Sequence, residues 1–178
     1  MNARTVIRHI LGYLFGFSVF LLGIPLGLGL LAKLTDGLVF VGIIPDERVR
    51  LILALVIGLV GVAFALWSNL YLFLVGRGGP ADAFGVALSP RSQNLVTSGP
   101  YRWTRNPMAF GALSIYLAVA LYLDSAACLA VVAVLWIAAP IYLKRVEEKR
   151  LLADFGDAFV QYRRTVPMLI PLPHRRVV

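Results

Sequence analysis

Cysteine, histidine and charged residues are scarce in this chain of 178 residues. A single cysteine, Cys128, excludes a disulfide within the chain and a cysteine-based metal centre. The two histidines, His9 and His174, stand near opposite ends of the sequence, so we predict no metal site. Only 15% of the residues are charged, whereas a soluble domain usually carries about 25%. The composition therefore argues against a soluble globular protein.

Signature motifs of soluble enzymes are also missing. The GRGGP stretch at 76–80 lacks the spacing of a dinucleotide-binding loop and follows no strand pattern. There is no P-loop, no HExxH zinc motif and no GxSxG nucleophile motif. The net charge of +8 does not predict a nucleic-acid partner, because no soluble basic domain carries it. In a membrane protein, such a charge more often reflects a basic cytoplasmic face.

Long apolar runs dominate what is present: 60% of the residues are hydrophobic, and the mean hydropathy is +0.82. We predict an all-α polytopic membrane protein with four main transmembrane helices, followed by cytoplasmic helical segments at the C-terminal end. The third and fourth helices would form a hairpin that turns at Asp124 and Ser125. The third run has only about 16 residues, which is marginal for a complete span. The four runs cover roughly residues 9–32, 49–75, 108–123 and 126–143.

The distribution of Lys and Arg predicts the orientation. Four spans place both termini, segment 76–107 and the chain after Leu143 on one side, together with 14 of the 17 basic residues. The remaining three, Lys33, Arg48 and Arg50, lie on the other side. Because basic loops stay in the cytoplasm, we expect both termini to be cytoplasmic. No linker or internal repeat divides the chain, so residues 1–178 are predicted to form one domain.

Two polar segments would meet on the cytoplasmic face, namely segment 76–107 and the charged helix KRVEEKRLLAD that begins at Lys144. Adjacent helical residues point about 100° apart, so Glu147 and Glu148 cannot both face one ligand. The alternative is a solvated helix beside the membrane, with Glu147 within i,i+3 reach of Arg150. Arg102 and Arg105 could likewise be anchors for lipid phosphates at the interface.

A longer ordered pattern resembles the integral-membrane methyltransferases, which include the isoprenylcysteine carboxyl methyltransferases and, more distantly, the phospholipid N-methyltransferases. The segment LVTSGPYRWTRNPM, residues 95–108, is similar to the most specific motif of that family. The resemblance covers about the second half of the chain. Its other elements are GRGGP at 76–80, Gly111, the Glu147–Glu148 pair, Phe155–Gly156, Tyr162 and Val166–Pro167.

The resemblance implies methyl transfer from S-adenosylmethionine in a cytoplasm-facing pocket without a Rossmann fold, within a bacterial inner-membrane protein. Residues 1–75 would then supply two spans, and residues 76–178 the cofactor-binding and catalytic half. The implied cofactor contacts are Gln93, Asn94, Leu95, Val96, Tyr101, Asn106, Ser114, Ile115, Tyr116, Leu117 and Glu147. The implied catalytic residues are Arg105, Asn106 and Glu147. Arg102, Arg105 and Arg145 would bind the polar end of a lipid or other amphiphilic acceptor.

Departures from the family pattern concern the acceptor. Ala109 replaces a common Tyr, Ala158 and Gln161 replace residues that are often acidic, and Leu143 stands where the carboxyl methyltransferases have a substrate-binding Arg. The sequence leaves open a carboxylate, amine or thiol acceptor, and it does not define the oligomeric state. Two rivals remain at this point: an NADPH-dependent membrane reductase related to sterol reductases, and a small membrane protein without enzymatic activity.

Overall fold

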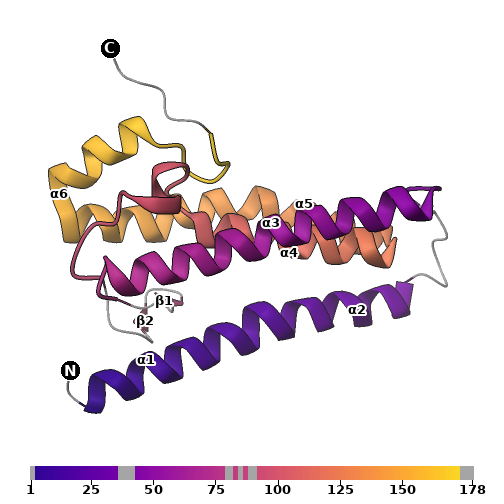
Figure 1. The fold of residues 1–178 in the computed structure, drawn as a ribbon, viewed down its shortest axis with the longest axis horizontal. Helices are drawn as coiled ribbons and strands as arrows, with labels where there is room; N and C mark the ends of the chain where they lie inside the picture. The colour runs from indigo at the N-terminus through magenta and orange to yellow at the C-terminus, as the bar shows by residue number, and fades with distance from the viewer. Residues whose placement is uncertain (1–2, 36–42, 79–81, 84–85, 88–91, 173–178) are drawn as a thin grey trace.

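The computed structural model describes residues 3–35, 43–78, 82–83, 86–87 and 92–172, and these residues are overwhelmingly helical (Figure 1). The chain begins with one long helix built from α1 (Ala3–Gly16), a π-helical stretch η1 (Phe17–Gly23) and α2 (Ile24–Thr35). Tyr116 of the bundle donates a hydrogen bond from its hydroxyl to the carbonyl of Phe20 at 3.0 Å. This bond ties the π-helical stretch to the rest of the protein.

Helix α3 (Glu47–Leu74) begins at Asp46, whose carboxylate accepts hydrogen bonds from the backbone N–H groups of Arg48 and Val49. It packs closely along α4 (Pro107–Leu123). Two glycines make this close approach possible: a Cβ at Gly61 would lie 2.8 Å from the carbonyl oxygen of Gly111, and one at Gly111 would lie 2.6 Å from that of Gly61. Small residues at helix crossings serve the same purpose in membrane bundles.

Helices α4 and α5 (Ala126–Tyr142) form the predicted hairpin. Pro107 occupies the first turn of α4, as expected for a residue that lacks a backbone N–H. Asp124 ends the helix in a left-handed conformation (φ 53°), and Ser125 caps α5 by accepting from the Cys128 N–H. The main apolar core lies between α2, α4 and α5, where Leu28, Leu113, Ala120, Cys128 and Val132 are buried.

The charged C-terminal part continues α5 without a break. A π turn, η3 (Leu143–Glu147), leads into α6 (Glu148–Thr165), which is kinked at Gly156. Segment 76–94 shows no helix or strand period in the sequence, yet it contains two strands of two residues each. The strands β1 (Asp82–Ala83) and β2 (Val86–Ala87) pair antiparallel. Strands this short leave no alternating pattern in a sequence.

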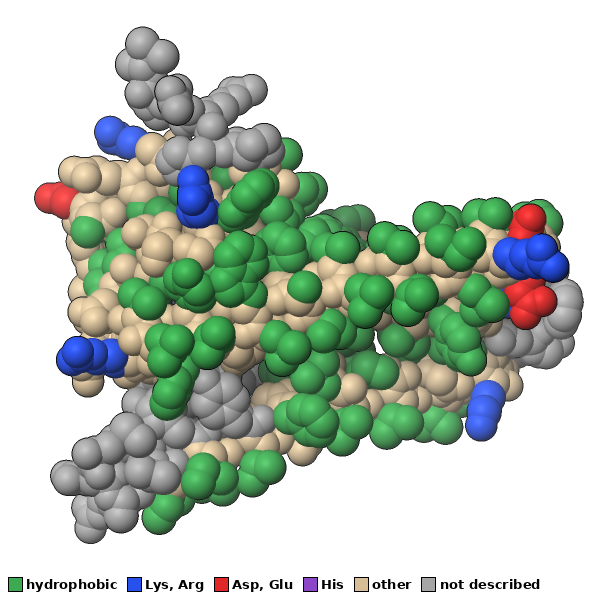
Figure 2. Space-filling model, in the orientation of Figure 1, with side chains coloured by type: hydrophobic (Ala, Val, Ile, Leu, Met, Phe, Trp, Pro, Cys, Tyr) green, Lys and Arg blue, Asp and Glu red, His purple; other side chains and the backbone are tan. Residues whose placement is uncertain are grey.

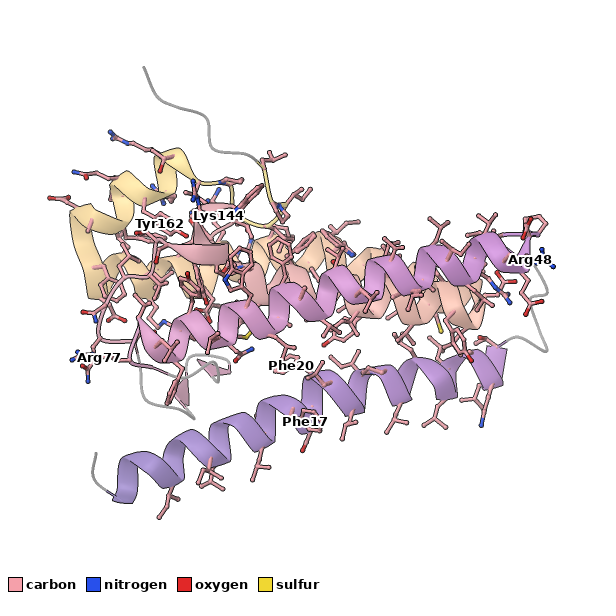
Figure 3. The ribbon with its side chains drawn as sticks, in the orientation of Figure 1. Phe17, Phe20, Arg48, Arg77, Lys144 and Tyr162 are labelled. Carbon is pink, nitrogen blue, oxygen red and sulfur yellow. The ribbon has the colours of Figure 1, made fainter. Side chains whose placement is uncertain are left out.

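Among the described residues, three helical stretches are long and apolar enough to cross a membrane: Ile10–Thr35, Glu47–Leu74 and the stretch Ala126–Thr165, whose apolar part is α5. Helix α4 is apolar but has only 17 residues. Three long apolar helices and one shorter apolar helix thus occupy the four predicted runs, and the count of four membrane spans stays a prediction. Figure 2 shows hydrophobic side chains along the middle of the helices and charged side chains mainly toward their ends. Figure 3 likewise places Arg48 at one end and Arg77 at the other.

Candidate active site

The residues of the LVTSGPYRWTRNP segment lie at the end of the bundle where α3 ends and α6 begins (Figure 1). Gly99 begins a short 3-10 helix, η2 (Gly99–Arg102), with a positive φ of 60°. A Cβ at Gly99 would lie 2.4 Å from the ring of Tyr71. Glycine is thus required here both for the backbone conformation and for contact with α3.

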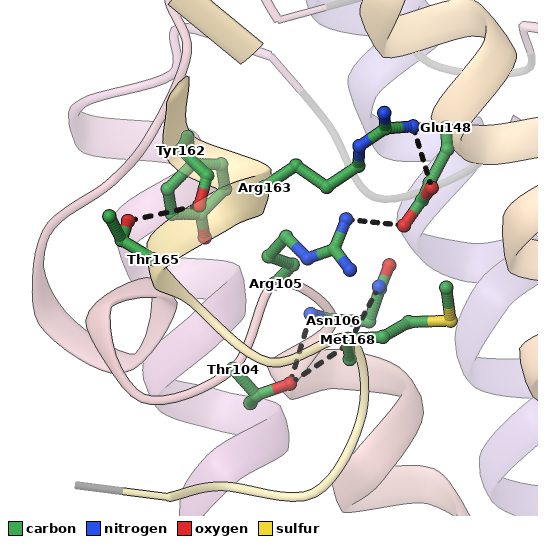
Figure 4. A network of polar contacts seen from close by, with 8 residues as sticks. All are labelled: Thr104, Arg105, Asn106, Glu148, Tyr162, Arg163, Thr165 and Met168. Carbon is green, nitrogen blue, oxygen red and sulfur yellow. Dashed lines mark hydrogen bonds and ion pairs between the residues drawn. The ribbon is translucent and has the colours of Figure 1, made fainter. Parts of the chain in front are cut away.

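The C-terminal segment after α6 folds back over Thr104, Arg105 and Asn106 (Figure 4). The Thr104 hydroxyl and the Asn106 side-chain amide both donate to the carbonyl of Met168, at 3.0 and 2.9 Å. The backbone N–H of Arg105 donates to the carbonyl of Pro167 at 2.9 Å. These bonds hold the TRN segment rigidly beneath the C-terminal segment, although the two are some sixty positions apart in the sequence.

A buried ion pair forms the centre of this network. The guanidinium of Arg105 contacts the carboxylate of Glu148, and both side chains are more than nine-tenths buried. Arg163 from α6 lies 3.6 Å from the second carboxylate oxygen (Figure 4). Burial lowers the pKa of Arg105, while the negative charge of Glu148 opposes that shift. The Nε atom of Arg105 is buried and finds no acceptor within the described part of the chain.

Glu147 lies apart from this pair. Its carboxylate accepts from Arg150 at 2.6 Å, as the i,i+3 spacing predicted, and both side chains are partly exposed. Burial raises the pKa of the Glu147 carboxyl group above its ordinary value. The two neighbouring glutamates therefore have different partners: Glu148 meets Arg105, and Glu147, which the resemblance assigns to the cofactor, meets Arg150.

The π turn explains this assignment. The backbone N–H of Glu148 donates to the carbonyl of Leu143, which is an i→i+5 bond. In a regular α-helix, the residue that follows buried Leu143 on the same face is Glu147, at i+4. The extra residue of the π turn brings Glu148 to that inward position instead. Reasoning from a spacing of 3.6 residues per turn could not reveal this shift.

Tyr162 is a second residue to which sequence reasoning gave no role in the site. Its hydroxyl donates to the backbone carbonyl of Tyr101 at 2.6 Å. Its ring is buried with Phe159 and Val166, against which Leu95 packs. Burial raises the pKa of Tyr162 well above its usual range, so the hydroxyl remains a donor. The signal in the sequence was its place in the Phe155–Pro167 pattern.

The remaining predicted cofactor residues fall into two groups. Gln93 and Asn94 donate from their backbone N–H groups to the carbonyl of Gly76, and Val96 is buried beside them. This first group lies at the end of α3, next to η2. The second group lies inside α4, two to three turns from Asn106: Ser114, Ile115, Tyr116 and Leu117.

The second group is engaged in helix packing. Ser114 donates to the carbonyl of Phe110 within its own helix, and Tyr116 donates to Phe20 of the N-terminal helix. Arg102 and Arg145 are exposed, and neither joins the network around Glu148. Arg145 instead lines a separate hollow with Ile141, Lys144 and Lys149. Arg105 and Asn106 thus belong to one polar network at the end of the bundle, whereas Ser114 to Leu117 lie further along α4.

No group of three His, Cys, Asp or Glu residues within the described ranges could hold a metal ion. Comparisons with known proteins identify the family. The model of the phospholipid methyltransferase family matches residues 49–158, which is more than half of the chain. The chain belongs to the phospholipid methyltransferase family. The match runs from α3 to the first half of α6 and includes both Arg105 and Glu148.

A curated relative supports the same family. The chain is 31% identical over 112 residues to a methanethiol S-methyltransferase of Mycobacterium tuberculosis (strain ATCC 25618 / H37Rv). The match covers 63% of this chain but only 41% of the relative, so the chain corresponds to less than half of that protein. No solved structure matches the chain. Family membership and the long apolar helices identify this phospholipid methyltransferase family member as an integral membrane protein.

Proposed function

We propose that this protein transfers a methyl group from S-adenosylmethionine to an amphiphilic acceptor at the surface of the membrane. The observation that carries the proposal is the buried Arg105–Glu148 pair inside the family-matched region, closed over by the C-terminal segment. S-adenosylmethionine, when bound, supplies an electrophilic methyl group on a sulfonium. The protein then has to align the acceptor with that methyl group and exclude water.

The residues present fit such a cofactor. S-adenosylmethionine carries a cationic sulfonium, an amino-acid tail and an adenosine, and it therefore needs a carboxylate, a hydrogen-bond donor and aromatic surface. Glu147 offers a half-buried carboxylate, and Arg105 has a buried Nε donor that no described residue uses. Tyr101 offers an aromatic ring suited to cation–π contact. We assign Glu147 and Tyr101 to the cofactor, and we assign Glu148 to positioning Arg105.

The proposed arrangement in the membrane has four crossings. Helix α4, with 17 residues, would be about 26 Å long, slightly less than the roughly 30 Å of a hydrocarbon core. With α4 as the fourth span, both termini and the Arg105 site lie on one side. The bias of Lys and Arg supports the cytoplasmic side of a bacterial inner membrane. An acceptor with an apolar tail would then enter from the bilayer, with Arg105 or Arg102 at its polar end.

Two acceptor classes follow from the comparisons. The family description points to a phospholipid, whose reacting group would be an amine, and the curated relative is described as acting on methanethiol, a thiol. Transfer of a labelled methyl group from S-adenosylmethionine to membrane extracts and to methanethiol would distinguish them. Label in the lipid fraction supports the first class, and label in a volatile product supports the second.

The first test is direct binding. Isothermal titration of S-adenosylmethionine into detergent-solubilised protein should show saturable binding, and NADPH should show none. Glu147→Ala should weaken that binding by about 1–3 kcal/mol, because a charged hydrogen-bond partner is lost. The matched control is Asp157→Ala, an exposed carboxylate further along α6, which should leave affinity unchanged. Folded protein that binds no S-adenosylmethionine would end the proposal.

A further inference from the structure

The hollow beside η3 combines three cations with an apolar wall. It has a volume of about 380 Å³ and is lined by Ile141, Lys144, Arg145 and Lys149. The three basic side chains are exposed, and none of the ion pairs among the described residues involves them. The nearby glutamates are already engaged, because Glu147 pairs with Arg150 and Glu148 pairs with Arg105. The described part of the chain therefore leaves the positive charge of the hollow uncompensated.

The helix places these cations side by side. Lys149 lies four residues after Arg145, and Lys144 is the neighbour of Arg145, so all three line the same hollow. Like charges at this spacing destabilise a helix. A single bound anion would turn this repulsion into attraction, because all three cations are within reach of the same hollow. Phosphate suits such a cluster, because Arg binds it through its planar guanidinium and Lys as a point charge.

An apolar stripe runs from the hollow along α5. Ile141, Ile137 and Val134 follow each other at helical spacing, and they are 50%, 69% and 63% exposed. Such a stripe on a membrane helix contacts acyl chains. The headgroup and an acyl chain of one lipid molecule would thus contact adjacent parts of the same helix face.

We propose that this face binds a phospholipid with a net negative headgroup, with its phosphate among Lys144, Arg145 and Lys149 and an acyl chain along Ile141, Ile137 and Val134. The proposal needs only that α5 contacts the bilayer, and it does not depend on methyl transfer. The lipid binds beside the turn that sets the positions of Glu147 and Glu148. It is held by residues other than the Arg105–Glu148 pair.

The test is lipid binding by the full chain in detergent, measured by native mass spectrometry. Dioleoyl phosphatidylglycerol should bind more tightly than dioleoyl phosphatidylcholine. Each cation removed should weaken phosphatidylglycerol binding about fivefold, so that K144Q/R145Q/K149Q loses roughly a hundredfold. The control K33Q/R48Q/R164Q removes the same charge from exposed positions elsewhere and should retain the preference.

Three results would overturn the proposal: equal affinity for the two lipids, an equal loss in both triple variants, or equally tight binding of inorganic phosphate alone. An equal loss in both triple variants would mean that binding reflects general charge attraction. Equally tight binding of phosphate alone would mean that the site binds anions and does not recognise lipid. Circular dichroism checks that the variants fold. If K144Q/R145Q/K149Q does not, the single variant K149Q replaces it, with a loss of about fivefold expected and unchanged affinity contradicting the proposal.

Discussion

Glu148→Gln is the sharpest perturbation of the buried network, because it removes one charge of an ion pair and changes little else. Arg105 and Glu148 are 9% and 7% exposed, so the guanidinium left behind would remain largely out of water. Removing one partner of a buried pair costs roughly 3–5 kcal/mol, since the other charge is left uncompensated. Glutamine keeps a hydrogen-bond acceptor for Arg105, which reduces the loss. The repulsion between Arg163 and Arg105 persists, so a loss is still expected. We expect a loss near the lower end, about 3 kcal/mol.

The neighbouring substitution Glu147→Gln is the matched control. It removes the same charge one residue away, from a pair whose side chains are 26% and 17% exposed. Ion pairs with access to solvent contribute about 0–1 kcal/mol. The free energy of unfolding in detergent micelles, followed by the helical circular dichroism signal, should therefore separate the two variants by about 2 kcal/mol or more.

A double variant tests the cause of the loss. Replacing a buried pair by apolar side chains of similar volume is often neutral or stabilising. Arg105→Met combined with Glu148→Met should thus recover most of the stability that Glu148→Gln loses, while binding of S-adenosylmethionine remains impaired. Equal losses in Glu148→Gln and Glu147→Gln would refute the reasoning, because the burial of the Arg105–Glu148 pair would then have no energetic consequence.

Three further predictions concern packing, the Tyr101 contact and pH. Gly111→Ala should lower the free energy of unfolding by about 1–3 kcal/mol, since its Cβ would meet α3 backbone at 2.6 Å; Gly27→Ala, with open space around it, is the control. Tyr162→Phe should cost about 1–3 kcal/mol in the same assay by leaving the Tyr101 carbonyl without its donor, and an unchanged midpoint would count against that bond. S-adenosylmethionine affinity, measured by titration calorimetry, should fall as pH falls toward 4.5. The raised pKa of Glu147 means that its carboxylate takes up a proton at a higher pH than an ordinary glutamate does. Glu147→Gln should remove that pH dependence, and a dependence that persists would exclude Glu147 as its source.

The helices could be predicted from the sequence because each depends on a local signal. Uninterrupted apolar runs predicted α3 and α5, and the Asp124–Ser125 pair predicted the hairpin turn. The π-helical stretch η1 was not predictable. Nothing in FSVFLLG distinguishes it from an α-helix, and it is tied to the bundle by a hydroxyl that comes from Tyr116, 96 positions away.

The candidate site was predictable in its parts but not in its contacts. The resemblance singled out Arg105, Asn106 and the pair of glutamates, because these residues stand in an ordered motif. The bonds from Thr104 and Asn106 to Met168 could not be foreseen, since they join segments through backbone carbonyls that every residue possesses. Contacts of this kind depend on the direction that the chain takes after α6, and the kink at Gly156 within α6 contributes to that direction.

The π turn η3 connects the two sites that we propose. Its i→i+5 bond from Glu148 to Leu143 turns Glu148 inward to Arg105, and Lys144 and Arg145 of the same turn line the hollow on the outer face. A return to α-helical spacing would move Glu147 to the inward position. Isolated π turns inside α-helices occur frequently at functional sites, where one inserted residue reorients the side chains that follow. A lipid phosphate bound at Lys144 and Arg145 would therefore contact the same turn that holds Glu148 against Arg105.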